Sequence, residues 1–363
     1  MTADDNNLEA SPRIMRELPA VIQETPLVKA ETPATGDGVQ GNEFAVPQRK
    51  RRRWPIVIGI IIVLIIAAGG VTYYVIHQQA AQQDSQRRDA YKTLNQAIAL
   101  ITESDAVVVR LDDAINKQVT IDDVPQLQAL LDQIPTARSS LDTAVETATD
   151  AKNHFKDQDG LDLAQHVLNA ASSRQVLLEN GSGLIEKDIA ATTSLSLLNE
   201  ALDFLFDADS AMRDAAERSA SGSTDQIQEA IDLNNSAKDK LDQAQSKLTD
   251  AQTAFPQVEF DTISTYISLK MESADLALSA DEALINGDIE TAQSLNDEFA
   301  KKDEEVVAAA AQIPSDPTSL ITTAYEQTTA DIRGLYQDAR TQATQADVFI
   351  RDYVGITAQA GVQ

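Results

Sequence analysis

Apolar side chains recur along most of the chain at alternating steps of three and four residues, from about residue 84 onward. This spacing places them on one face of an α-helix, and its persistence over several heptads is typical of helices that pack together. The clearest run is Leu130, Ile134, Ala137, Leu141, Ala144, Ala148, Ala151 and Phe155. The spacing recurs at Ala230, Asn234, Ala237, Leu241, Ala244, Leu248, Ala251 and Phe255, and more loosely at Tyr325, Ile332, Leu335, Ala339, Ala346, Phe349 and Tyr353. The pattern predicts an all-α fold.

The first two runs lie 100 residues apart, and their similarity extends beyond the apolar positions. Residues 141–144 match 241–244, and Phe155 matches Phe255. About a quarter of the positions over 126–195 are identical at this single offset. We therefore expect an internal repeat of about 100 residues, because one supersecondary unit used twice leaves such a period.

Helix-breaking residues divide the region into segments. The predicted breaks are 119–125, Gly160, 181–183, 219–224, Pro256, 286–287, and Pro314 with Pro317. They predict roughly eight helices of about 20–35 residues, and short turns make neighbours antiparallel. The result is an elongated antiparallel bundle with repeat 1 over 84–220, repeat 2 over 221–354 and a flexible C-terminus over 355–363.

Many apolar positions are alanine, which buries little area, so the large residues should dominate stability. We expect these to be Phe155, Leu178, Leu195, Phe204, Leu205, Phe255, Ile267, Phe299 and Phe349.

Residues 54–77 contain an uncharged stretch of about 22 residues, which is long enough to cross the hydrocarbon core of a bilayer. Trp54, Tyr73 and Tyr74 bracket it as interfacial anchors. A buried soluble helix and a cleaved signal peptide are the alternatives. The length of the stretch and the roughly 50 residues before it favour an uncleaved transmembrane helix.

Basic residues predict the orientation of this helix. Arg49, Lys50, Arg51, Arg52 and Arg53 precede the apolar stretch directly, as a basic stop over 49–53. The excess of positive charge on the cytoplasmic side places the N-terminus inside and the C-terminal region outside the cell membrane.

Residues 1–48 contain five prolines and few large apolar residues, which predicts a disordered cytoplasmic tail. Thr25 and Thr32 each follow Glu and precede Pro, and they are candidate phosphorylation sites within a tail that is otherwise a solvated segment.

The composition of the chain excludes several classes of function. The formal net charge is −28, and residues 77–363 carry 49 acidic and 21 basic side chains. This charge argues against nucleic-acid binding, which needs clustered Lys and Arg. The chain has no cysteine, which excludes disulfides and thiol chemistry. Aromatic residues make up only 4%, which disfavours a β-sandwich or barrel.

No catalytic, cofactor-binding or metal-binding motif is present. His154 and His166 flank the turn at Gly160, and with Asp157 or Asp162 they are a candidate metal site; the alternative is a pair of solvated histidines at helix ends. The acids before Gly160 do not match the spacing of a calcium-binding loop. We therefore predict no enzyme activity, cofactor or metal.

The layout of a cytoplasmic tail, the 49–53 basic run, one span and a helical exported region resembles uncharacterised single-pass envelope proteins of Gram-positive bacteria. It is also similar to the layout of TolA-type proteins, and the helical repeat resembles spectrin-like units. These resemblances imply a membrane-anchored helical protein and transfer no functional residue.

We predict a non-enzymatic extracytoplasmic scaffold or interaction protein of the cell envelope. The alternative is a single-pass sensor whose exported bundle binds a ligand or wall component and signals through the tail. The expected partners are the lipid bilayer and an envelope protein or wall polymer, with no nucleic acid. The sequence leaves a homo-oligomer open.

Overall fold

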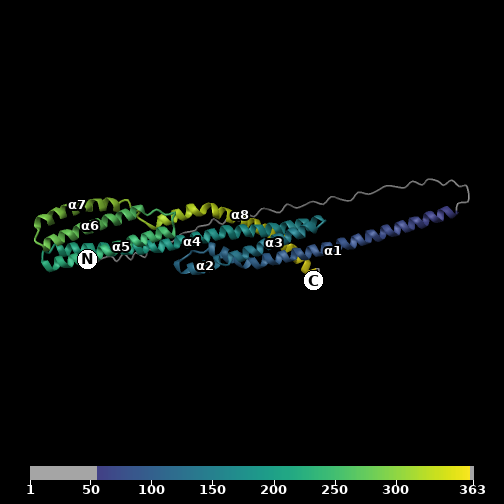
Figure 1. The fold of residues 1–363 in the computed structure, drawn as a ribbon, viewed down its shortest axis with the longest axis horizontal. Helices are drawn as coiled ribbons and strands as arrows, with labels where there is room; N and C mark the ends of the chain where they lie inside the picture. Colours follow the sequence, from purple (N-terminus) through teal and green to yellow (C-terminus); the bar gives the residue numbers. More distant parts are fainter. Residues whose placement is uncertain (1–54, 360–363) are drawn as a thin grey trace, which may run out of the picture. The chain divides into compact units, whose positions relative to one another are not determined.

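A computed structural model describes residues 55–359, with side chains for residues 82–355. The described residues form helices joined by short turns and contain no strand, which confirms the predicted all-α class. In chain order the helices are α1 (Pro55–Ile115), α2 (Val124–Leu131), α3 (Ile134–His154), α4 (Gln158–Ser219), α5 (Thr224–Ala254), α6 (Asp261–Ile285), α7 (Ile289–Ala310) and α8 (Thr318–Gln359), with a short 3₁₀ helix, Ile121–Asp123, before α2 (Figure 1).

The chain divides at Gln83, and the described residues after it, 84–359, form one compact unit. The 62-residue helix α4 runs through this unit and packs against α3 and α5 along different parts of its length. The 42-residue helix α8 returns along α4 (Figure 1). The unit contains two hydrophobic cores, and α4 and α8 contribute to both.

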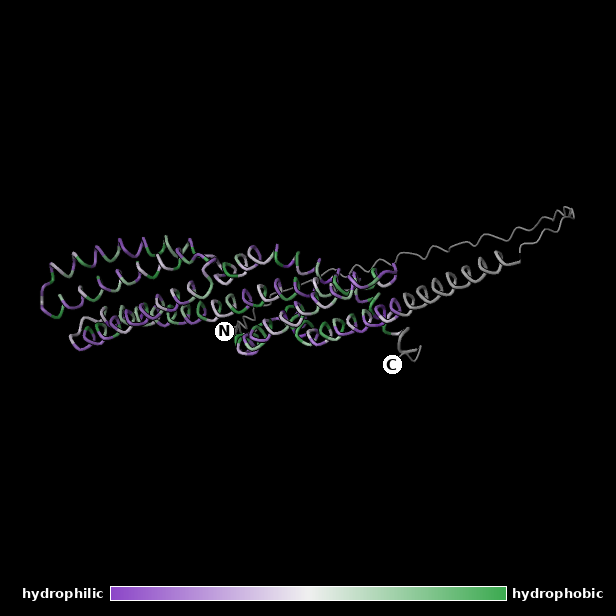
Figure 2. Tube along the Cα trace, turned by 45° about the vertical axis from the view of Figure 1, so that its right-hand side comes forward, coloured by the Kyte–Doolittle hydropathy of each residue, from purple (hydrophilic) through white to green (hydrophobic). Residues whose placement is uncertain are grey.

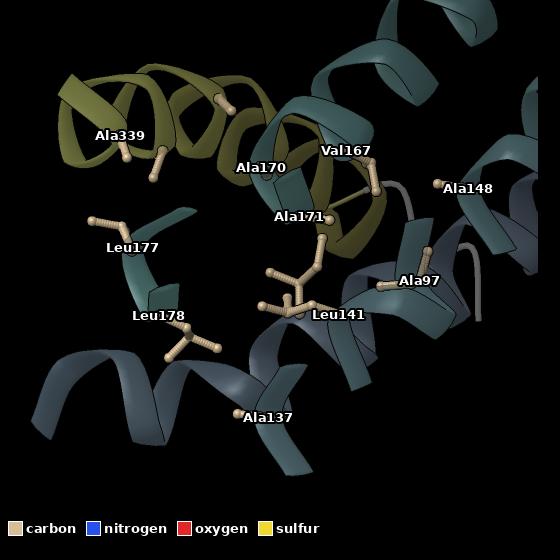
Figure 3. Close-up of a cluster of buried hydrophobic side chains, with 14 of the residues drawn as sticks. Ala97, Ala137, Leu141, Ala148, Val167, Ala170, Ala171, Leu177, Leu178 and Ala339 are labelled. Carbon is tan, nitrogen blue, oxygen red and sulfur yellow. The ribbon is translucent and has the colours of Figure 1, made fainter. Parts of the chain in front are cut away.

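The first core is built from α1, α2, α3, the first half of α4 and the second half of α8. Its inner layer combines leucines with alanines, and Leu141 and Leu178 are completely buried. Figure 3 shows Leu141, Leu178 and the small residues Ala97, Ala137, Ala148 and Ala171 between the helices. Because the alanines are short, the helix axes approach closely and each contact buries little area.

The second core contains the rest of α4, α5, α6 and the start of α8. Phe255, Phe260 and Ile263 are fully buried there. Figure 2 shows hydrophobic and hydrophilic positions alternating along the helices, as the helical spacing requires. The two clearest predicted apolar runs, over 130–155 and 230–255, are confirmed, since every member is buried.

Most predicted breaks are confirmed. Helices end or begin at 115–124, 154–158, 219–224, 254–261, 285–289 and 310–318. The break predicted at Gly160 comes slightly earlier, so that Gly160 lies in the first turn of α4, and a further break at 131–134 was not predicted. At the end of α6, Gly287 has φ +73°, its N–H donates to the Leu284 carbonyl, and the Asp288 N–H donates to the Ala283 carbonyl. This is a Schellman motif, which a glycine completes without steric cost.

The predicted break at 181–183 is wrong, because α4 continues through it. Gly181 is buried, and a Cβ atom there would lie 2.4 Å from Cδ2 of Leu111 on α1 and 3.1 Å from Cε2 of Tyr336 on α8. Glycine at this position allows three helices to approach closely and does not mark a turn. The predicted helix length of about 20–35 residues is wrong for the same reason, since α4 has 62 residues.

Two glycines of α4 should respond oppositely to alanine. Gly181→Ala should lower the free energy of unfolding by about 1–3 kcal/mol, because buried Leu111 must move. Gly183→Ala should raise it by about 0.4–1 kcal/mol, because a Cβ there meets only Ile332 atoms at 3.9 Å and alanine favours the helix. Urea unfolding followed by circular dichroism measures both. Equal stabilisation by the two substitutions would contradict the close approach at Gly181.

The third predicted apolar run is wrong in part. Leu335 and Phe349 are 55% and 51% exposed, although Ala339 and Ala346 of the same run are buried. The buried face of α8 also uses Tyr336 and lies one residue further along the chain than Leu335. Small residues at the contact allow α8 to pack close to α1 and α4, which leaves the larger side chains outside.

The expected large core residues are likewise confirmed in part. Phe155, Leu178, Leu205, Phe255 and Ile267 are buried. The rest are half-buried or exposed: Leu195, Phe204, Phe299 and Phe349.

The predicted transmembrane segment 54–77 lies outside the residues whose side chains the structure describes. The tail over 1–48 and the basic stop over 49–53 also lie outside the described residues, and these predictions stay predictions. Among residues 82–355, whose side chains are described, no helix combines the length and apolar character that a membrane span needs.

Candidate functional site

The contact of α4 with α1 and α8 contains a buried cation, Arg174, which is 6% exposed. Its Nε lies 2.6 Å from Oδ1 of Asp105 on α1, and its Nη1 lies 3.0 Å from Oδ1 of Asp347 on α8. Burial opposes the charge of Arg174, but the two carboxylates outweigh it and raise the pKa of the guanidinium. One side chain therefore connects three helices that are distant in sequence.

A second polar cluster joins α8 to α1. The Tyr336 hydroxyl donates to Oδ1 of Asp112 at 3.2 Å, and Nη2 of Arg340 lies 2.8 Å from Oδ2 of the same carboxylate. Burial and the neighbouring Asp112 charge raise the pKa of Tyr336, so its hydroxyl stays protonated as a donor. This cluster fixes the register of α8 along α1.

A third cluster joins the end of α4 to α5 and α6. The buried Asp281 carboxylate accepts hydrogen bonds from the Ser219 hydroxyl and, at 3.2 Å, from the Asn234 amide. Burial raises the pKa of Asp281, although both donors act in the opposite direction. In all three clusters the partners come from different helices, so the clusters specify which helices meet and in what register.

Two open grooves lie on the surface of the unit. One, of about 330 Å³, lies where α2, α4 and the end of α5 meet, and it is lined mainly by apolar atoms, including those of Leu131, Ile189 and Ala190. The other, of about 420 Å³, lies between α4 and α8 and is lined by polar uncharged and apolar side chains. Neither groove is lined by a pair of carboxylates, and the Ser173 hydroxyl in the second groove donates to the Asn169 carbonyl oxygen.

The candidate metal residues around Gly160 have separate partners. Nδ1 of His154 lies 2.8 Å from the Asp150 carbonyl oxygen. Asp157 caps α4 by accepting from the Gly160 N–H at 2.9 Å. His166 stacks on Phe349, with ring centroids 3.7 Å apart. Among the described residues, no group of three or more potential ligands is placed to hold a metal ion.

The other predicted site residues lie outside the described part of the chain. These are Thr25, Thr32, Arg49, Lys50, Arg51, Arg52, Arg53 and Trp54, together with the side chains of Tyr73 and Tyr74.

Sequence reasoning did not identify Arg174 or the groove between α4 and α8. Asp105 and Asp347 lie 69 and 173 residues from Arg174, so no local spacing connects them. One usable signal is that Arg174 follows Ala170 and Ala171 at helical spacing, which places it on the same face as small apolar residues, where a buried charge requires partners.

Comparison of the chain with known protein families, with curated proteins and with solved structures finds no match.

Proposed function

We propose that the chain is a non-enzymatic, membrane-anchored scaffold of the cell envelope, with its helical unit outside the membrane. The observation that carries this proposal is the charge asymmetry around residues 54–77. Five basic residues precede the apolar stretch, and the region after it holds the entire net negative charge. This distribution favours a cytoplasmic tail and an exported helical unit.

The packing of the helical unit supports a scaffold over a sensor. A sensor is favoured by a deep pocket with converging polar groups. The apolar positions between the helices are instead filled, with Leu141, Ala144, Leu241 and Ala244 completely buried. The two grooves are open and lie at the surface. A filled, acidic helical unit suits a soluble spacer that presents its surface to partners.

We also propose that this scaffold arose by duplication of a unit of about 100 residues. The buried positions of α3 and α5 correspond at the 100-residue offset, from Ala137 and Ala237 to Phe155 and Phe255. Ser173 of α4 and its counterpart Ser273 of α6 are both buried as well. In this alignment the first half of α4 corresponds to α6, and the second half of α4 corresponds to α7.

Cysteine labelling tests the topology, because the chain has no native cysteine. Ser221→Cys places a thiol in the exposed turn between α4 and α5, and Ser11→Cys places one in the N-terminal tail. A membrane-impermeant maleimide on intact cells should label the variant at position 221 only. Labelling at position 11 only would reverse the orientation and contradict the proposal, and labelling of neither before lysis would place both segments inside the cell.

A further inference from the structure

The groove between α4 and α8 is lined by residues that carry no carboxylate, ammonium or guanidinium group. His166, Asn169 and Val176 line it from α4, and Gln342, Gln345 and Phe349 line it from α8. None of its lining residues is Asp, Glu, Lys or Arg, although these make up 24% of the chain. An uncharged groove offers no ion-pair partner to a charged ligand, and the net charge of −28 further disfavours anionic ligands.

The polar groups of the groove are available for hydrogen bonds. Among the described residues, the side-chain amides of Gln342 and Gln345 donate to and accept from no other side chain. The Asn169 side-chain oxygen accepts from Gln165 at 2.8 Å, and the N–H₂ group of the same amide is a donor. The groove thus offers both donors and acceptors along two helices.

Two apolar side chains of the groove are exposed. Phe349 is 51% exposed, and Val176 is 40% exposed. The Phe349 ring lies nearly parallel to the His166 ring, at an interplanar angle of 9°, which restrains it as a flat platform. A sugar ring carries C–H groups on one face and hydroxyls around its edge. An exposed aromatic ring bordered by side-chain amides is complementary to both.

The groove is preformed by the buried contacts beneath it. Asp347 neighbours the groove residues of α8, and its ion pair with Arg174 joins α8 to α4. Because both walls are rigid helices held by this pair, a ligand would not need to order the site, which reduces the entropic cost of binding.

We propose that the groove between α4 and α8 binds a neutral saccharide, with a sugar ring on Phe349 and its hydroxyls hydrogen-bonded to Asn169, Gln342 and Gln345. The volume of about 420 Å³ falls within the usual range of small-ligand sites. A purely apolar ligand would leave the amides unpaired at a cost. This inference rests on the proposed function for its cellular setting. It identifies the partner of the scaffold as an uncharged wall polysaccharide.

Calorimetric titration of the full-length chain tests the proposal, in a preparation free of sugar-based detergents. The probes are chitotetraose and maltotetraose, two neutral saccharides that differ in their N-acetyl groups, and a blocked alanine tripeptide as a neutral non-saccharide. We expect binding of at least one saccharide at millimolar or lower concentration and none of the tripeptide. Absence of saccharide binding, or equal binding of the tripeptide, would overturn the proposal.

Three variants locate the binding. Phe349→Ala and Gln345→Ala remove exposed groups that line the groove, and each should weaken saccharide binding about tenfold or more, which corresponds to about 1.4 kcal/mol. Gln337→Ala, an exposed glutamine of α8 outside the groove, should leave binding unchanged. Binding that all three variants retain would place the saccharide elsewhere and contradict the site. These titrations do not depend on membrane orientation, so failure of the topology and failure of the groove are separate results.

Discussion

Phe255→Ala should lower the free energy of unfolding by about 3–5 kcal/mol. Phe255 is completely buried at the end of α5, in the second core. The two residues that lie closest before it on the apolar side, Ala251 and Ala254, are alanines, which bury little area themselves. Removal of the ring therefore leaves a cavity that short side chains cannot fill. Urea unfolding followed by circular dichroism measures the loss.

Phe206→Ala is the matched control. Phe206 belongs to α4 and is 75% exposed, so its truncation should change the free energy of unfolding by no more than about 0.5 kcal/mol. If Phe255→Ala has an effect as small as Phe206→Ala, the face of α5 that we assign to the core is incorrect.

The sequence was a good guide to α3 and α5 because their apolar positions repeat regularly. The two predicted runs are buried from the first member to the last, although Leu130 lies on α2, and they include Asn234, which the spacing placed among apolar residues. The helical period alone determines which side of such a helix faces the core. The buried Asn234 amide donates a hydrogen bond to the Asp281 carboxylate, a partner that the sequence could not reveal.

The sequence predicted the structure poorly at certain glycines and large apolar residues, because these residue types occur in more than one structural role. Gly181 and Gly287 both stand near the end of a predicted helix, yet only Gly287 has a positive φ. At the 100-residue offset, Lys187 stands where Gly287 would complete a Schellman motif, and α4 continues there. Position 181 requires glycine because Leu111 lies close to it in space, although the two residues are 70 positions apart in sequence.

The groove between α4 and α8 could not be predicted from the sequence for a related reason. It depends on α8 lying along the first half of α4, and the looser apolar spacing of α8 gave the wrong face at Leu335 and Phe349. The position of α8 is specified by polar contacts to Asp112 and Arg174 in addition to apolar burial. Partners of this kind become visible only when the helices are assembled.

Arg174→Met should lower the free energy of unfolding by about 3 kcal/mol, the lower end of the range for a broken buried ion pair. Methionine retains much of the volume of the side chain, so the loss reports mainly the charge. The cost is at the lower end because the Asp105 and Asp347 side chains are 36% and 45% exposed and can take up water. Arg174→Lys should not restore stability fully, because an ammonium cannot form paired contacts to two carboxylates as a guanidinium does.

Arg138→Met provides the matched control for this ion pair. Arg138 of α3 contacts Glu179 of α4 at 3.0 Å, with both side chains well exposed, and such a pair contributes about 0–1 kcal/mol. The two variants should also differ in where they act. Arg174→Met should speed amide hydrogen exchange in the second half of α8, which Asp347 joins to α4, and should leave α5 protected. Equal losses for Arg174→Met and Arg138→Met, or exchange that rises uniformly through α5 and α8, would show that the buried pair does not hold α8 in place.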